Sequence, residues 1–221
     1  MTLTEENYIK AIYQLGKYGT LNVSTNSIAE ALDTKASSVT DMIKKLDEKG
    51  YANYKKYQGV ILSVEGKKIA ANIVRKHRLW EVFLVEKLNF AWDEVHDIAE
   101  QLEHIKSEKL INELDKLLDY PTHDPHGDPI PDKLGDIKKT DKILLFNLEE
   151  NTSGVCVGVK DTSSAFLRYL DKHNIALGSE ITVLSKEDFD DSMVIKIQDS
   201  VMSISQVVAN NLFVKQLSQK N

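Results

Sequence analysis

The sequence predicts a mainly α-helical chain with a small β component, arranged in three parts. Apolar residues follow the helical period through most of the first 120 residues. All four prolines lie between Pro121 and Pro131, which indicates a stiff connection and then a domain boundary. Beyond residue 142, short apolar runs separated by polar turns indicate the strands of a small barrel. With 221 residues, the chain is long enough for two or three small domains with cores of their own.

Three short helices and a hairpin are expected before residue 64. Thr4 is a candidate cap for the first helix, and Thr25 or Asn26 for the second. The third helix follows a short break and is stopped by Gly50. The expected helices cover about 4–17, 26–32 and 36–49, and the expected strands 51–56 and 60–63. The order helix, helix, tight turn, helix, hairpin is that of a winged helix-turn-helix.

The middle of the chain is expected to hold three more helices, over about 65–88, 92–106 and 107–119. Their apolar residues exceed what one small core needs, so we expect part of this surface to form a dimer seam. The residues concerned are Ile98, Leu102, Ile105, Leu110, Ile111, Leu114, Leu117 and Leu118.

The last part is expected to be a small barrel with strands over 143–146, 155–159, 180–184 and 193–197. A short helix is expected over about 163–173, and a last turn over 205–210.

The net charge of −6 is unevenly distributed along the chain. Residues 1–70 carry 10 Lys and Arg against 8 Asp and Glu, or +2. Residues 71–140 carry 10 against 15, or −5, and residues 141–221 carry 8 against 11, or −3. The first segment can therefore meet a polyanion such as DNA, while the middle segment is suited to cations.

Several features indicate a cytoplasmic protein with no membrane partner. No apolar run approaches the roughly 20 residues of a membrane span. The acidic start does not have the design of a signal peptide. The single cysteine, Cys156, excludes an internal disulfide framework and lies in an apolar run, where a buried structural thiol is expected.

Histidines and carboxylates gather between residues 77 and 126 at helical spacing. His96, Glu100, Glu103 and His104 stand at positions i, i+4, i+7 and i+8, so one side of a helix is expected to present all four. His77 and Glu81 repeat the i, i+4 relation, and Asp124 and His126 lie in the proline-containing loop. Imidazole and carboxylate groups are the ligands of Mn²⁺, Fe²⁺ and Zn²⁺, so the cluster predicts a metal centre.

The third helix would be the recognition helix of a helix-turn-helix, whose N-terminal residues contact base edges in the major groove. Short hydroxyl side chains at a helix N-terminus also serve as ordinary caps, but the basic hairpin that follows favours DNA. We expect base contacts from the first helical turn, and phosphate contacts from later lysines and from the wing. The candidates are Lys35, Ser37, Ser38, Thr40, Lys44, Lys45, Lys55 and Lys56.

Three motifs carry a specific resemblance. The segments 76–81, 95–104 and 125–131 resemble the metal-dependent repressors of the diphtheria toxin repressor family. The similarity is greatest to the manganese-responsive branch that retains a C-terminal barrel. It implies a DNA-binding domain over 1–64, a helical metal-binding and dimerisation domain over 65–120, a proline-rich linker over 121–141 and an SH3-like domain over 142–221. The last is of the kind shared with a ferrous-iron transport accessory protein.

The resemblance implies two metal sites. The primary site would use Glu100, Glu103 and His104 with Asn7, where relatives commonly have Asp or Met. A hard oxygen from Glu100 favours Mn²⁺. Lys10 replaces a carboxylate found in some compact manganese regulators, which argues against a paired-ion site. The second site would gather ligands from the helical domain, the loop and the barrel, with Asp124 where relatives often have Cys. Its expected ligands are His77, Glu81, His96, Asp124, His126 and Asp161.

The function that the resemblance implies is repression of metal-uptake genes by a homodimer on palindromic double-stranded DNA operators. Mn²⁺, or alternatively Fe²⁺, would be the corepressor, with Zn²⁺, Co²⁺ or Cd²⁺ as substitutes in vitro. No enzymatic activity and no small organic substrate are expected. Without metal, the clustered carboxylates are expected to repel one another and leave the winged domains freer to move.

Two alternatives remain open at the level of sequence. A carboxylate and histidine metalloenzyme would need Glu-x-x-His motifs on two helices, and it predicts turnover without operator affinity. A winged-helix regulator that senses an organic ligand predicts no stoichiometric metal binding.

Overall fold

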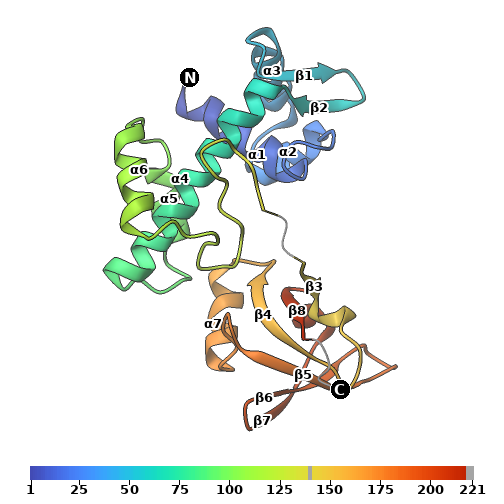
Figure 1. Ribbon diagram of the computed structural model, residues 1–221. Helices are drawn as coiled ribbons and strands as arrows, with labels where there is room; N and C mark the ends of the chain where they lie inside the picture. Colours follow the sequence, from blue (N-terminus) through green and yellow to red (C-terminus); the bar gives the residue numbers. More distant parts are fainter. Residues whose placement is uncertain (139–140, 218–221) are drawn as a thin grey trace. The chain divides into compact units, whose positions relative to one another are not determined.

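The computed structural model describes residues 1–138 and 141–217 (Figure 1). The chain forms two compact units, and each is described by itself. The first unit comprises Met1–Phe83, Asp97–Thr122 and Ile130–Lys138. The second comprises Leu84–His96, His123–Pro129 and the described part of Lys139–Asn221.

The first unit begins with the predicted winged helix-turn-helix. Its elements are α1 (Leu3–Leu15), α2 (Thr25–Ala31), α3 (Ala36–Glu48), β1 (Ala52–Lys55) and β2 (Gly59–Leu62). On α3, Val39, Ile43 and Leu46 stand at i, i+4 and i+7 and are fully buried in the core of this part. The opposite face of α3 is therefore left to solvent.

Both predicted N-caps in this part were wrong by one or two residues. Thr2, and not Thr4, caps α1, because the carboxylate of Glu5 bonds back to the Thr2 amide and completes a capping box. Ser24, and not Thr25 or Asn26, caps α2, since its hydroxyl accepts from the amide of Ser27.

The hairpin forms in the predicted place. β1 and β2 are antiparallel, with Ala52 opposite Leu62 and Lys55 opposite Gly59. Gly59 has a φ of +88°, and a Cβ there would meet the carbonyl of Val23 at 2.4 Å. Glycine is therefore required where the wing approaches the segment before α2.

Three helices complete the first unit: α4 (Val64–Leu88), of which the unit holds the part up to Phe83, α5 (His96–Leu102), of which it holds the part from Asp97, and α6 (Glu108–Leu117). Figure 1 shows α5 and α6 alongside α4, and one apolar core joins the three. The expected helix over 92–106 was too long. Glu103 still bonds in helical register to Ala99, but Ile105 bonds back to Leu102 and turns the chain away.

The second unit contains a six-stranded antiparallel sheet in the order β3-β8-β4-β5-β6-β7. Register shifts in β4 and β5 bend the strands, as a small barrel requires. The elements are β3 (Ile143–Leu144), the 3₁₀ turn η1 (Leu145–Asn147), β4 (Ser153–Val159), α7 (Ser164–Lys172), β5 (Glu180–Lys186), β6 (Met193–Ile197), β7 (Ser200–Ile204), α8 (Gln206–Ala209) and β8 (Leu212–Gln216).

Two differences from the expected barrel have simple causes. The strand predicted over 143–146 gives way to a 3₁₀ turn after Leu144, because Leu145 and Leu148, three apart, are both fully buried. β7 and β8 were not predicted. β7 has three exposed residues, Ser200, Val201 and Ser203, so its apolar alternation is weak.

Among the described residues, no helix is both long enough and apolar enough to cross a membrane.

Candidate metal centre

A mostly buried cluster of polar and ionisable side chains joins α1, α4 and the end of α5 within the first unit. α1 contributes polar residues from one face, at positions i, i+1 and i+4. α4 contributes one histidine, and α5 and the turn after it contribute two carboxylates and a second histidine. The cluster consists of Glu6, Asn7, Lys10, His77, Glu100, Glu103 and His104.

Lys10 holds the carboxylates of this cluster together. Its ammonium Nζ is 2.5 Å from Oε1 of Glu100 and 2.6 Å from Oε2 of Glu103. Lys10 and Glu103 are buried, with exposed fractions of 5% and 0%. The expected repulsion between the carboxylates is therefore offset within the protein by the Lys10 ammonium. The expected freedom of the winged domains without metal stays a prediction.

His77 lies between two carboxylates. Its Nε2 is 3.0 Å from Glu81 and its Nδ1 is 2.7 Å from Glu103. Burial opposes a charge on this imidazole, but the hydrogen bonds to Glu103 and Glu81 outweigh it and raise the pKa of His77. His77 therefore contacts members of both predicted ligand sets.

The imidazole of His104 is oriented by the carboxylate of Glu6. Its Nδ1 is 2.6 Å from Oε2 of Glu6, and because a carboxylate can only accept, Nδ1 carries the proton. The lone pair is then on Nε2, which lies 3.9 Å from Oε1 of Glu103. A carboxylate that fixes the tautomer of a histidine in this way is typical of metal-binding imidazoles.

Two buried oxygens in the cluster have no hydrogen-bond partner among the described residues: Oδ1 of Asn7 and Oε1 of Glu103. Such atoms are costly unless something satisfies them. Two hard oxygens and one imidazole nitrogen match the preferences of Mn²⁺ and Fe²⁺. The residues present therefore fit a divalent cation at Asn7, Glu103 and His104.

α1 also connects the cluster to α3. Glu5, next to Glu6, is fully buried and its Oε1 accepts from Nζ of Lys45 and of Lys49, both at 2.8 Å. These two ammonium groups lower the pKa of Glu5 to about 2. α1 is thus bonded on one side to the expected recognition helix and on the other to the donor cluster.

Three family models match successive parts of this chain. They are described as the iron-dependent repressor N-terminal DNA-binding domain, over residues 1–60, the iron-dependent repressor metal-binding and dimerisation domain, over 63–132, and the FeoA domain, over 143–216.

Curated relatives agree with these matches. The manganese regulator MntR of Oceanobacillus iheyensis is 41% identical over 120 residues, which are 54% of this chain and 80% of the relative. The iron-dependent repressor IdeR of Mycobacterium leprae is 32% identical over 160 residues, 71% of this chain and 69% of the relative. The chain belongs to the diphtheria toxin repressor family. Against IdeR of Mycobacterium tuberculosis, at 34% identity, it spans 55% of the relative's length.

Solved structures extend the likeness to the whole chain. A manganese-dependent transcriptional repressor in complex with manganese superposes with a TM-score of 0.87 at 32% identity, and the match covers 96% of this chain and 100% of that one. The repressor ScaR with bound Cd²⁺ gives a TM-score of 0.80 at 31% identity, covering 96% and 99%. The predicted fold of this family, with its C-terminal domain, is confirmed.

The ligands that this family resemblance implies for a second site are divided between the two units. His77 and Glu81 belong to the first unit. His96, Asp124, His126 and Asp161 belong to the second, and their role as ligands stays a prediction.

The loop around Asp124 is held by its own backbone. Oδ1 of Asp124 accepts from the amides of His126, at 2.8 Å, and Asp128, at 3.0 Å. Nε2 of His126 is 2.8 Å from the carbonyl of Trp92, so it donates there, and the two rings stack. Gly127, at a φ of +82°, lies so close to Val157 that a Cβ would not fit. These bonds help to fix the loop in the second unit.

The predicted DNA contacts lie on exposed surface. Lys35, Ser37, Ser38 and Lys44 are exposed on α3 or just before it, while Thr40 is half-buried and donates to the carbonyl of Ala36. In the wing, Lys55 and Lys56 are exposed, and Nζ of Lys56 lies 5.0 Å above the ring of Tyr57. Lys45 is also exposed, but its ammonium pairs with Glu5.

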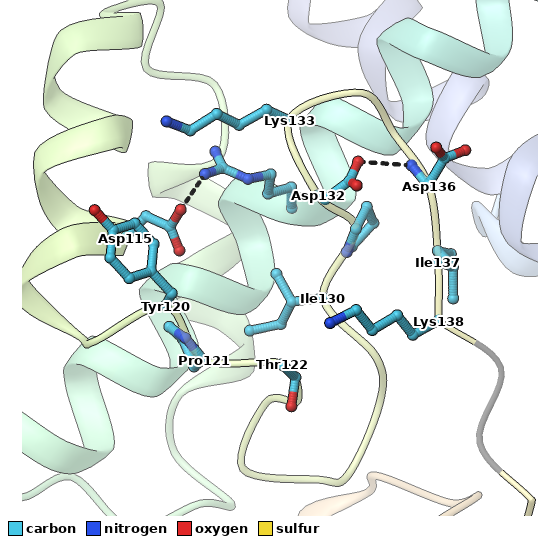
Figure 2. Close-up of a pocket in the computed structure, with 12 residues that line it drawn as sticks. Asp115, Tyr120, Pro121, Thr122, Ile130, Asp132, Lys133, Asp136, Ile137 and Lys138 are labelled. Atoms are coloured by element: carbon cyan, nitrogen blue, oxygen red, sulfur yellow. Dashed lines mark hydrogen bonds and ion pairs between the residues drawn. The ribbon is translucent and has the colours of Figure 1, made fainter.

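A cavity of about 360 Å³ in the first unit contains none of the predicted ligands. Figure 2 shows its lining, from Asp115 and Tyr120 across to Lys133 and Asp136. A buried ion pair at 2.6 Å joins Arg75 to Asp115 beside it. The lining carries side chains of both signs of charge.

Three residues that matter here, Glu5, Glu6 and Lys10, are not among the predicted ligands. The available indication was their position: Glu6 and Lys10 share a face of an amphipathic helix with Asn7, and charges buried on such a face need partners.

Proposed function

We propose that this protein is a metal-dependent transcriptional repressor that binds DNA as a homodimer. Mn²⁺ is the favoured corepressor and Fe²⁺ the alternative, and the targets are palindromic operators of metal-uptake genes. Its relatives are named as repressors and regulators that depend on iron or manganese. The protein has no enzymatic role in this proposal and acts in the cytoplasm.

One observation carries the proposal: α1 bonds to both the expected recognition helix and the donor cluster. Glu5 holds Lys45 and Lys49 of α3, while Glu6 holds His104. A movement of α1 relative to the end of α5 must therefore be felt by α3. An effector can shift such an arrangement only by binding one state more tightly.

The donors that would hold the ion are Asn7, from α1, with Glu103 and His104, from the end of α5. A bound divalent ion supplies two positive charges that satisfy the partnerless oxygens of Asn7 and Glu103. Glu6 keeps Nε2 of His104 facing this position. The residues thereby fix α1 against α5, which orients the recognition helix for DNA.

The expected dimer has a matching surface. On α6, Ile111 and Leu114 are buried in the unit's own core, but Leu110 and Leu117 are 42% and 60% exposed. These two residues stand at i and i+7 and share one face. An apolar face of this kind supports pairing with a second copy.

Operator binding in the presence and absence of metal tests the proposal. An operator would be selected from random duplexes with the full chain and Mn²⁺, and then used in mobility-shift titrations with EDTA, Mn²⁺, anaerobic Fe²⁺ or Zn²⁺. We expect Glu103→Ala and His104→Ala to abolish metal-dependent binding, while gel filtration shows an unchanged dimer.

Glu180→Ala and His173→Ala are matched controls, since both residues belong to the second unit, far along the chain from the cluster. Metal-stimulated operator binding that persists in both cluster variants would contradict the proposal. Turnover of a substrate, or the lack of stoichiometric Mn²⁺ binding in calorimetry, would favour the enzyme or the organic-ligand alternative.

A further inference from the structure

The Lys10 ammonium lies among three side chains that could bind a metal. Besides Glu100 and Glu103, its Nζ is 3.3 Å from Nδ1 of His77. The ligand atoms that these three residues offer lie within 4.8 Å of one another. The ammonium therefore takes a position that a divalent ion could otherwise occupy.

Glu103 divides the cluster into two halves. Its Oε2 faces Lys10 and His77, and we call His77, Glu100 and this oxygen the lysine half. Its Oε1 has no partner among the residues described, and lies 3.9 Å from Nε2 of His104. We call this oxygen, His104 and Asn7 the open half.

The two halves differ in their need for a cation. In the lysine half, each carboxylate oxygen that faces Nζ already has a charge-assisted hydrogen bond. The open half contains the two partnerless oxygens. Lys10 is only 5% exposed, and moving its ammonium out of the cluster would break its ion pairs with Glu100 and Glu103. A divalent ion placed in the lysine half would instead meet the ammonium as a like charge.

We propose that Lys10 is a tethered cation that permanently fills the lysine half, so that the cluster takes up one divalent ion, in the open half. Lys10 thus sets the number of ions. This inference rests on the proposed function, because it assumes that the open half binds the corepressor. It adds that the Lys10 ammonium supplies the positive charge at the position where a second metal ion would otherwise bind.

Counting bound Mn²⁺ tests this inference. Lys10→Met keeps an unbranched side chain and removes the charge. Metal-stripped full-length protein would be titrated with Mn²⁺ in calorimetry, in an Asp124→Asn and His126→Gln background that weakens the second ligand set. We expect one ion per chain with Lys10 and two with Met at this position. Lys172→Met, an exposed residue of α7, is the matched control and should leave one ion.

Electron paramagnetic resonance gives a second readout. Two Mn²⁺ ions that share the carboxylate of Glu103, one on each oxygen, couple magnetically to each other. The Lys10→Met spectrum should therefore broaden at full loading, while the parent keeps its six resolved lines. Mn²⁺ should also raise the thermal midpoint of Lys10→Met more than that of the parent, because the variant's buried carboxylates lack a counter-ion.

Two ions in the parent, or one ion in the Lys10 variants, would overturn the inference. If Lys10→Met does not fold, Lys10→Gln offers a neutral polar side chain that can still bond to one carboxylate. The proposed function is decided separately, by operator binding of His104→Ala, so either idea can fail alone. A normal loss of operator binding in His104→Ala with an unchanged ion count in Lys10→Met would reject the tethered cation only.

Discussion

Glu103 and Asp124 are both buried carboxylates at predicted ligand positions, yet the fold satisfies them in different ways. Glu103 bonds to side chains of two other helices, Lys10 on α1 and His77 on α4. These partners are 93 and 26 residues away in the sequence. Asp124 bonds to backbone amides two and four residues ahead, in its own loop.

The two carboxylates differ in where their bonding partners come from. Oε2 of Glu103 is held by the Lys10 ammonium, while its Oε1 has no partner among the described residues, so Glu103 can bind a metal ion without losing that ion pair. The backbone amides that bond to Asp124 belong to its own loop and cannot leave it. Because the partners of Glu103 come from other helices, a change there reaches α1 and α4. The first arrangement is suited to a switch and the second to a scaffold.

The largest expected effect is on the free energy of unfolding of metal-free protein when the charge of Glu103 or of Asp124 is removed. Glu103→Gln leaves Lys10 and His77 buried with a weakened partner, and such changes cost about 3 kcal/mol of unfolding free energy. Asp124→Asn keeps an oxygen that accepts from the same amides, so its cost is about 1 kcal/mol. Urea unfolding of both variants in EDTA, followed by circular dichroism, measures the two costs. Equal losses would remove the distinction between the two carboxylates.

A second, smaller effect is expected at Asn7, whose partnerless oxygen belongs to the cluster. Asn7→Asp exchanges a neutral oxygen for a charged one at the same place. We expect Mn²⁺ affinity to rise about tenfold, or ~1.4 kcal/mol. Asn151→Asp, an exposed turn residue of the second unit, makes the same change of charge elsewhere. Calorimetry that finds the same affinity in both variants would place Asn7 outside the metal site.

Much of the fold could be predicted because it depends on local patterns. Val39, Ile43 and Leu46 stand at helical spacing, which predicted α3, and the structure buries all three. The two apolar runs on either side of the turn at Gly59 predicted the wing. The caps and the end of α5 were missed by a few residues. At those places the choice between neighbouring hydroxyls, or between helix and turn, depends on bonds that the pattern does not contain.

The ligand positions could be predicted from their spacing, but their surroundings could not. Spacing placed Glu100, Glu103 and His104 together because they share one short segment. Nothing local in the sequence pairs Lys10 with residues 90 and 93 positions away. For that reason the expected repulsion was replaced by an ion-pair network in the structure.

The smallest expected effect concerns Glu5, a third buried carboxylate, which tests how α1 holds α3. Its pKa is about 2, below its ordinary value of 4.5, because Lys45 and Lys49 donate to it. The folded protein therefore loses this proton more readily than the unfolded chain does. The resulting stabilisation is fully present above pH about 4.5 and is lost as the pH falls towards 2.

Both lysines are nearly half exposed, at 48% and 42%, so water screens them and the gain should be about 1 kcal/mol or less. Urea unfolding of Glu5→Gln and the parent at pH 7, 4 and 3 measures it. We expect the parent's advantage at pH 7 to shrink at pH 4 and further at pH 3, and 1 M salt to reduce it at pH 7. Glu48→Gln, on the exposed face of α3, is the matched control. An advantage that does not change with pH would mean that Glu5 holds α3 by packing and not by charge.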